Sequence, residues 1–543
     1  MNDKPERMPN VPPFVKFVCA NVPMVFDDSL SYYEALCALW KYVSGMTDVI
    51  NNNATLEEEY IEKFNELNQA FNDLKTWVET YFDNLDVQEE INNKLDEMAE
   101  QGVLADIISQ YLNSIAIFGY DTVADMKDAE NLIDGSYART LGYYAKNDGG
   151  GATYKIRNIT NDDVIDEAFI IEMNDSGNAL IAELIIDEPL DLRQLGCKND
   201  GVTDNHDVIQ EALNRGLSLF VGEGIYYCDG NLTLQPEGVT ITGVHNPLYY
   251  VEPTDGVLKF SGSGFDRASA VFTGLTLQNV AIVGSGTVGE EWDNTHGLKD
   301  IRATISKCSI KGFKYGIEHC GNLNIGQSHI FQNYIGIYQT GDSIIHDNDI
   351  YSNESDGYQT NSGIALNTIN NNRFEWNGGV GVHIEGSNHN TIMCNVFDRN
   401  GLEGILIYNC TRNSVIGNLL KRNYASSSEV NVDHANLRID TAYNTMVSNN
   451  TLIYAKQNDG GTGSNVPSTG LRMKASHNCY IIGNDLYNGG VDEPLSRNDV
   501  TGSIYVEKDL QQSVGSAATD AASTQTLANN LRTALITIGL VKQ

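Results

Sequence analysis

The sequence has few basic residues, few prolines and no long apolar run. Lys plus Arg number 35 against 72 Asp plus Glu, a formal net charge of −37 at pH 7. A field of that sign repels nucleic acid and anionic membranes, so we expect neither as a partner. No run approaches the roughly 18 apolar residues of a membrane-spanning helix, and the opening MNDKPERMPN lacks the apolar core of an export signal. The 11 prolines are too few for a proline-rich stalk.

Cysteine does not define a framework either. The nine cysteines are scattered, odd in number and never spaced as CxxC, which disfavours both a disulfide framework and a zinc site. We expect buried thiols in a protein that folds in a reducing cytoplasm, and no required metal or other cofactor. The hydrophobic content of 41% is sufficient for packed cores, and 543 residues predict several domains.

The front of the chain is predicted to hold a docking segment and a stalk. Residues 1–54 combine a proline-punctuated stretch with apolar residues at helical spacing, which predicts either a docking segment or a small helical subdomain. In 55–85 the apolar residues follow a 4-3 alternation that predicts a coiled coil, and a second helical stretch extends the predicted stalk over 55–112. The aromatic residues in this seam favour three or more strands; the alternative is one amphipathic helix on its own domain. The seam residues are Tyr60, Phe64, Leu67, Phe71, Leu74, Val78, Tyr81 and Leu85.

Residues 113–190 are predicted to form a small α+β linker module. Positions 142–156 indicate two short strands around a glycine turn, and AFIIEM and ALIAELII are further strand candidates. At the other end, apolar residues at helical spacing after an Ala/Ser/Thr-rich stretch predict a helical tip over 511–543.

Between these regions the sequence repeats. An Asn-x-apolar element recurs with spacings of 24, 23, 23, 32 and 34 residues, and two earlier copies begin with Cys308 and Ser328. Two further short strands accompany each copy, so that every repeat has three. Such repeats bury their apolar sides only by stacking, and asparagines at one corner can form a hydrogen-bonded ladder. The pattern predicts a mainly β fold with a parallel β-helix over 191–510. The asparagines are Asn348, Asn372, Asn395, Asn418, Asn450 and Asn484.

The start of the β-helix carries a family motif. Gly196, Asp200, Gly201 and Asp204 resemble the Gly-x-x-x-Asp-Gly-x-x-Asp stretch that precedes the capping helix in pectate-lyase-like β-helices. Asp204 can cap a helix whose apolar residues close the end of the stack, so we interpret these aspartates as structural. The apolar residues are Ile209, Ala212 and Leu213.

The motif VPPFVKFVCANVP, the heptads and the GYYAKNDGGG stretch resemble the front ends of bacteriophage tailspikes and neck appendages. The resemblance implies a homotrimeric virion appendage, made in the host cytoplasm and attached to tail or neck proteins through its N-terminal region. It implies binding, and often cleavage, of a host surface glycan or teichoic acid.

The strand after the longest loops presents two predicted outward columns. Aromatic, acidic and basic side chains on one flat face are typical of carbohydrate binding, and the long loops at 422–436 and 454–470 are expected to wall this face. One column is Glu318, Tyr338, Ala365, His383, Leu406, Arg438 and Arg472; the other is Asn367, Glu385, Tyr408, Asp440 and Lys474.

Glu385 and Asp440 lie two rungs apart in one column, about 9.6 Å between backbones. That separation suits an inverting glycosidase better than a retaining one. We therefore predict Glu385, Asp440 and His383 as catalytic residues. The predicted substrate-binding residues are Tyr338, Tyr408, Arg438, Arg472 and Lys474.

Glu375 and Asp398 form an alternative catalytic pair on adjacent rungs, about 4.8 Å apart. Ordinary ion pairing with neighbouring basic residues explains this pair equally well. For the site around Glu385, the alternative is a solvated polar sheet face without chemistry. The functional hypotheses are a tailspike that hydrolyses a host polysaccharide or teichoic acid, a non-enzymatic receptor-binding or structural fibre, and a free pectate-lyase-like enzyme. The stalk and the docking segment argue against the third hypothesis.

Overall fold

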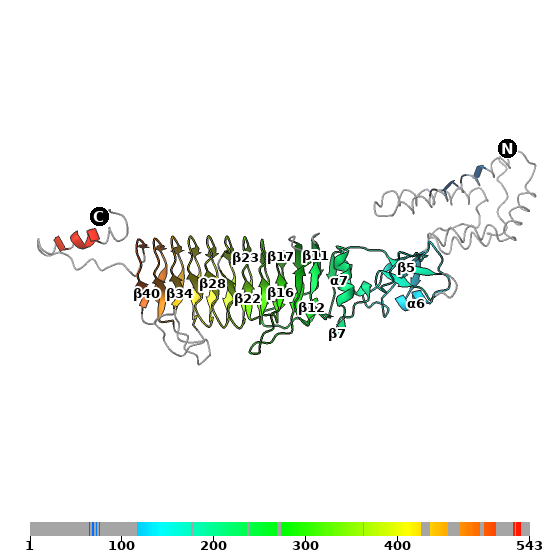
Figure 1. Ribbon diagram of the computed structural model, residues 1–543, viewed down its shortest axis with the longest axis horizontal. Helices are drawn as coiled ribbons and strands as arrows, with labels where there is room; N and C mark the ends of the chain where they lie inside the picture. Colours follow the sequence, from blue (N-terminus) through cyan, green and yellow to red (C-terminus); the bar gives the residue numbers. More distant parts are fainter. Residues whose placement is uncertain are drawn as a thin grey trace, which may run out of the picture. The chain divides into compact units, whose positions relative to one another are not determined.

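The computed structural model describes most of the chain from residue 117 onward. The described residues are 65, 68, 69, 72, 75, 76, 117–174, 179–235, 238–268, 273–361, 363–424, 435–453, 467–488, 493–506, 525, 526 and 528–533. The predicted docking segment 1–54 lies outside them, as do most of the predicted stalk and tip. The few described residues of the stalk and of the tip are helical (Figure 1). Oligomeric state and the predicted domain boundaries therefore stay predictions.

The described chain divides into two units, and the first contains a five-stranded sheet. The strand order is β1 (Ile117–Tyr120), β2 (Tyr137–Thr140), β3 (Thr153–Asn158), β5 (Leu180–Leu184) and β4 (Ile170–Glu172), with the short helix α6 (Val123–Lys127) after β1. Of the two strands predicted within 142–156, only β3 forms. The other segment is a loop because the Asp148 carboxylate accepts four backbone N–H groups, from residues 143, 144, 145 and 150.

The second unit is a parallel β-helix, which confirms the predicted mainly β fold (Figure 1). Three parallel sheets run its length, and each turn of the chain adds one strand to each sheet. We name them sheets 1, 2 and 3.

Within the described ranges, the sheets contain 11, 13 and 12 strands. Sheet 1 consists of β10 (Leu232–Leu234), β13 (Phe265–Arg267), β16 (His296–Lys299), β19 (Tyr315–Glu318), β22 (Ile335–Tyr338), β25 (Tyr358–Thr360), β28 (Val382–Glu385), β31 (Ile405–Tyr408), β34 (Ala435–Asp440), β37 (Thr469–Lys474) and β40 (Glu493–Asn498). Sheet 2 consists of β6 (Leu190–Asp191), β8 (Leu219–Val221), β11 (Val239–Gly243), β14 (Gly274–Gln278), β17 (Arg302–Ser306), β20 (Asn324–Gly326), β23 (Ile344–His346), β26 (Thr368–Asn370), β29 (Thr391–Met393), β32 (Ser414–Ile416), β35 (Met446–Ser448), β38 (Tyr480–Ile482) and β41 (Ile504–Val506). Sheet 3 consists of β7 (Asp200–Asp204), β9 (Ile225–Cys228), β12 (Val257–Phe260), β15 (Ala281–Val283), β18 (Ser309–Lys311), β21 (His329–Phe331), β24 (Asp349–Tyr351), β27 (Arg373–Glu375), β30 (Val396–Asp398), β33 (Leu419–Lys421), β36 (Thr451–Ile453) and β39 (Asp485–Asn488).

The core is built from like residues stacked in register. Successive turns place the same inward position of sheet 3 one above the next, and these side chains are buried. The rings of Phe374 and Phe397 stack at 5.1 Å with an interplanar angle of 6°. Each turn buries its apolar side only against the neighbouring turns. A single turn is therefore not stable alone, and the stability of the β-helix comes from the contacts between stacked turns.

Hydrogen-bonded asparagine ladders line the corners of the β-helix. In the predicted ladder between sheets 2 and 3, the amide of each asparagine donates to the next, as from Asn372 to Asn395 at 3.0 Å and from Asn395 to Asn418 at 3.0 Å. The corner between sheets 3 and 1 carries a second ladder, and the corner between sheets 1 and 2 a shorter third one. Their members are Asn333, Asn353, Asn377, Asn400, Asn423 and Asn436, and Asn367, Asn390 and Asn413.

The capping helix α7 (His206–Asn214) forms as the motif predicts, with Ile209, Ala212 and Leu213 buried. Its N-cap residue is Asn205, one residue later than expected, and Asp204 Oδ1 accepts from the His206 N–H at 2.9 Å. The 3-10 helix η1 (Leu192–Leu195) precedes it. Asp200 accepts from Val202 and Thr203 and fixes the turn, which supports a structural role.

Candidate functional site on sheet 1

The outward side chains of sheet 1 form two columns. The first is Thr233, Asp266, Lys299, Glu318, Tyr338, Gln359, His383, Leu406, Arg438, Arg472 and Ser496. The second is Glu385, Tyr408, Asp440, Lys474 and Asn498. All eight residues predicted for catalysis and substrate binding therefore share one face.

The prediction for one rung was wrong. Ala365 and Asn367 do not belong to these columns, because the strand of that rung is β25 and presents Gln359 outward. The inward position is taken by Tyr358, whose hydroxyl lies 3.2 Å from the Thr340 hydroxyl in the core. The strand was missed because its short sequence, Tyr-Gln-Thr, lacks the aliphatic inward residue that marks most of the other strands of this sheet. Ala365 forms an isolated bridge at the next corner, and Asn367 joins a ladder.

His383 lies between two carboxylates. Its Nδ1 is 3.0 Å from Oδ2 of Asp356, and its Nε2 is 3.9 Å from Oε2 of Glu385. Asp356 is buried and is fixed in place because its Oδ1 accepts the Val380 N–H at 2.7 Å. The Glu385 side chain is 40% exposed. The buried Asp356 thus orients the His383 imidazole so that its other nitrogen faces the solvent-accessible carboxyl group of Glu385.

The sequence prediction did not include Asp356. Asp356 precedes β25, whereas the sequence pattern predicts this strand around Ala365 instead. With the strand misplaced, nothing in the pattern indicates that Asp356 lies close to His383 on the next strand of sheet 1. With β25 placed correctly, an aspartate at the corner one turn before His383 is the signal that identifies it.

Asp440 has a different environment. Its Oδ2 accepts from Arg438 Nε at 2.9 Å, and Arg438 also lies 3.5 Å from the buried Glu403. Asp440 is only 4% exposed, and its Oδ1 makes no hydrogen bond within the described part of the chain. One oxygen of Asp440 is thus held by Arg438 and the other is uncommitted, which makes this side chain a candidate proton acceptor.

Aromatic side chains flank these acids. Tyr338 stacks on Tyr315 at 4.7 Å between ring centroids, and Tyr408 is exposed between Glu385 and Asp440 in the second column. Burial, followed by the negative charges of Glu318 and Glu385, raises the pKa of Tyr338 above its ordinary value. Its phenol therefore keeps its proton at neutral pH. Aromatic faces beside carboxyl groups suit stacking against sugar rings.

Basic side chains lie beside Asp440 on β34 and on the next strand, β37. Arg438 and Arg472 are adjacent in the first column, and Lys474 is exposed in the second. Arg438 is matched by two carboxylates, Asp440 and Glu403. Arg472 is mostly buried. The loops predicted to wall this face lie largely outside the described residues.

The alternative pair is an ion-paired cluster on sheet 3. Glu375 and Asp398 are register neighbours and both are buried. Arg373 lies 2.7 Å from Glu375, Arg399 lies 3.0 Å from Asp398, and Arg422 donates to both oxygens of Asp398. The hydroxyl of Tyr249 also donates to Glu375 at 2.5 Å. Carboxylates held by this many donors favour the structural interpretation.

The seven cysteines in the described ranges are free, and Cys394 is the exposed one among them. In the same ranges, no group of three His, Cys, Asp or Glu residues could hold a metal ion. No helix that the structure describes is long and apolar enough to span a membrane.

Comparison with known proteins agrees with this architecture. Residues 265–420 match the family described as the right-handed β-helix region. The structure is similar to the enzymatically active domain of tailspike protein 2 of bacteriophage CBA120, with 16% identity, a TM-score of 0.52, and coverage of 70% of this chain and 62% of that one. It is also similar to the capsular polysaccharide depolymerase tailspike gp49 of Acinetobacter baumannii bacteriophage Fri1 (14% identity, TM-score 0.40, 76% and 78% coverage). A third similar structure is the A-module of Azotobacter vinelandii mannuronan C-5 epimerase AlgE4 (15% identity, TM-score 0.42, 59% and 97% coverage).

No curated protein matches the sequence. At these identities the structural similarities concern the fold. At that level, the family match and the similarity to tailspike protein 2 of phage CBA120 confirm the predicted likeness to phage tailspikes built on a parallel β-helix.

Proposed function

We propose that the protein is a bacteriophage tailspike, a virion appendage that adsorbs to a host surface polysaccharide through sheet 1 and hydrolyses it. The observation that carries the proposal is the Asp356–His383–Glu385 array beside exposed Tyr408. A half-exposed carboxyl group next to an oriented imidazole, with aromatic side chains nearby, matches what glycoside hydrolysis requires. The fold shared with tailspike protein 2 of phage CBA120, whose described domain is enzymatically active, supports the same conclusion.

In the proposed reaction a water molecule attacks the anomeric carbon while the bond to the leaving oxygen breaks. Glu385 donates its proton to the leaving oxygen, and Asp440 Oδ1 accepts the proton of the water. The two residues lie two register steps apart in one column, so their backbones are about 9.6 Å apart and favour inversion. Because Asp440 is only 4% exposed and its Oδ1 is buried, the groups that cover this oxygen have to move before water can reach it. His383 positions Glu385. After each turnover Asp440 releases its proton to water and Glu385 takes one up from water, which restores both acids.

Teichoic acid is the second candidate substrate, and exposed Lys474 next to Arg472 is the observation in its favour. In that case the scissile bond is a phosphodiester, and the basic residues stabilise its developing charge. The pairing of Arg438 with Asp440 and Glu403 weakens this alternative, since those carboxylates repel a phosphate.

A non-enzymatic receptor-binding or structural fibre would use the same face without turnover. The discriminating experiment is incubation of the protein with host cell walls, followed by analysis of soluble fragments. Fragments with new reducing ends establish hydrolysis, glycerol- or ribitol-phosphate pieces identify teichoic acid, and binding without release favours the fibre.

We further propose a homotrimer attached to tail or neck proteins through its N-terminal region. Light scattering should then give about three times the chain mass of 59.7 kDa. A monomer mass would refute the trimer without affecting the assignment of the site.

A further inference from the structure

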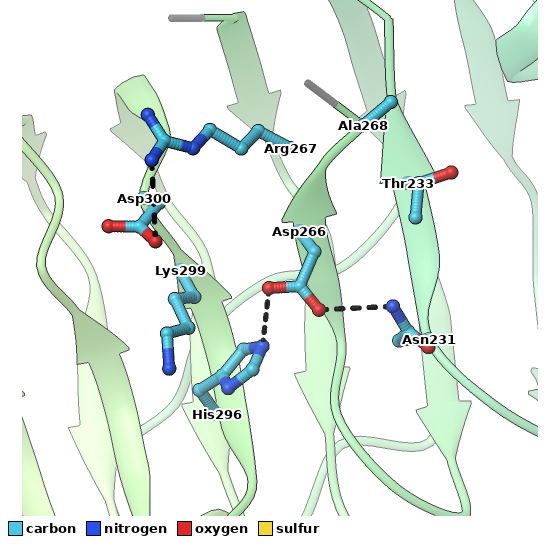
Figure 2. Close-up of a pocket in the computed structure, with 8 residues that line it drawn as sticks. All are labelled: Asn231, Thr233, Asp266, Arg267, Ala268, His296, Lys299 and Asp300. Atoms are coloured by element: carbon cyan, nitrogen blue, oxygen red, sulfur yellow. Dashed lines mark hydrogen bonds and ion pairs between the residues drawn. The ribbon is translucent and has the colours of Figure 1, made fainter. Parts of the chain in front are cut away.

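A pocket of about 610 Å³ lies on the outer face of sheet 1, toward its N-terminal end (Figure 2). Strands β10, β13 and β16 form its floor, and its lining includes Asn231, Asp266, Arg267, His296 and Lys299. Asp266 lies in the first column, five register steps before His383. At about 4.8 Å per step the pocket is therefore roughly 24 Å from the Glu385 site along the β-helix.

The charged groups in this pocket are paired with one another or with the adjacent Glu318. His296 Nε2 lies 2.8 Å from Oδ1 of Asp266, whose Oδ2 accepts from the Asn231 amide at 3.0 Å. Arg267 lies 3.9 Å from Asp300, and Lys299 lies 3.1 Å from the buried Glu318. Figure 2 shows Asp266 between Asn231 and His296, and Arg267 above Asp300.

This pairing indicates which kind of ligand fits. Two carboxylates and two permanent cations line the pocket, so neither sign is in excess, and an anionic polymer gains little net attraction. Alternating donors and acceptors on rigid, mutually held side chains are instead suited to hydroxyl groups, which donate and accept at once. Next to the pocket, the first column continues through Glu318 to Tyr338, whose ring stacks on Tyr315.

We infer that the pocket is a subsite for an uncharged, hydroxyl-rich sugar unit, and that one polysaccharide chain runs along sheet 1 from this pocket to Glu385. The inference rests on the proposed function for the position of the bond that is cleaved. The pocket itself anchors the chain at a distance and takes no part in the chemistry. The protein then acts within long chains and prefers polymers to short oligosaccharides.

The test compares full-length wild-type protein with Asp266→Ala and the milder Asp266→Asn. The probe is wall polysaccharide from a bacterium that adsorbs the protein, supplied both as the intact polymer and as short oligosaccharides derived from it. Asp229→Ala, at an exposed carboxylate near the same end of the β-helix but outside the pocket lining, is the matched control. Thermal unfolding of each variant checks that the fold is intact.

We expect Asp266→Ala to raise KM for the polymer about tenfold, because charge-assisted hydrogen bonds to the sugar are lost. The kcat value and the cleavage of short oligosaccharides should not change, and Asp266→Asn should have a smaller effect. Binding of the polymer should persist near 1 M salt, where the Debye length is about 3 Å.

An unchanged KM and Kd for the polymer in Asp266→Ala would overturn the inference. A fall in kcat for both substrate lengths would also overturn it, since the pocket would then be the reaction centre. Loss of wild-type binding at high salt would exclude the uncharged ligand. If the wild type binds but releases no fragments, the proposed hydrolysis fails, and the effect of Asp266→Ala on Kd still decides the subsite.

Discussion

Asp356 and His383 are separated by 27 residues in the sequence and meet at 3.0 Å in the structure. The contact links consecutive turns of the β-helix, because Asp356 precedes β25 and His383 lies on β28, the next strand of sheet 1. It fixes the imidazole so that its other nitrogen faces Glu385. We regard this relationship as the structural basis of the candidate site.

Replacing Asp356 with Asn should lower kcat about tenfold while leaving KM nearly unchanged, because Asp356 positions His383 without touching substrate. The side chain of Asn can still accept the Val380 N–H, so the fold should persist. The measurement is the pH profile of kcat, which should differ between the variant and wild type. A variant with the wild-type profile would show that the contact is only structural.

Replacing His383 with Ala should reduce kcat further than Asp356→Asn does. Gln359→Ala, on the preceding strand of the same column, serves as the control for general disturbance of this face. Equal losses in the two variants would indicate a binding effect of the surface and would argue against a specific role for the imidazole.

Replacing the alternative pair should affect stability and not cleavage. Asp398→Ala leaves Arg422 buried without the carboxylate that accepts two of its hydrogen bonds, so we expect a loss of about 3–5 kcal/mol in unfolding free energy. Cleavage per folded molecule should stay at the wild-type level. Denaturant unfolding and rate measurements on the same preparation provide the check, and a selective loss of cleavage would revive Glu375 and Asp398 as catalytic residues.

Breaking one asparagine ladder should destabilise the β-helix. Asn395→Ala removes the acceptor of the Asn372 N–H and amide, and both are buried. Since an unmet buried donor costs about 1–3 kcal/mol, we expect a loss of roughly 3 kcal/mol in all. Asn370→Ala, on the outer face of β26, should cost far less. Similar unfolding free energies for the two variants would contradict the ladder's role.

The repeat was readable from the sequence because stacking leaves a strong local signature. Each turn needs an apolar residue at the inward position and a polar residue that can bond along the stack at a tight corner, so both recur at a regular spacing. Asn395 is such a corner residue: it directly precedes β30, and its backbone N–H donates to the side chain of Asn418 one turn further on. The inward residue of the same strand, Phe397, is buried.

The site was only partly predictable for the opposite reason. The contacts of Asp356 and Glu403, and the pocket around Asp266, depend on which residues of neighbouring turns face each other. These contacts leave no periodic mark in the sequence, and a single misplaced strand such as β25 is enough to hide them.

Acid should weaken the capped end of the β-helix. Hydrogen bonds from the Thr203 hydroxyl and backbone lower the pKa of Asp200 to about 2. Because the ordinary value is about 3.9, this carboxylate stabilises the folded state above about pH 4, and its contribution is lost as the pH falls toward 2. Asp200→Asn should therefore lower the unfolding temperature at pH 7, and the difference from wild type should vanish near pH 2. A difference that is independent of pH would contradict this account.

The most direct test of the central claim is fragment release from host wall polysaccharide by wild type, Glu385→Gln and Asp398→Asn, followed by mass analysis and detection of reducing ends. The account predicts fragments with new reducing ends from wild type and Asp398→Asn, and at least about a hundredfold slower release from Glu385→Gln. Release by Glu385→Gln at the wild-type rate would contradict the assignment of the site to sheet 1.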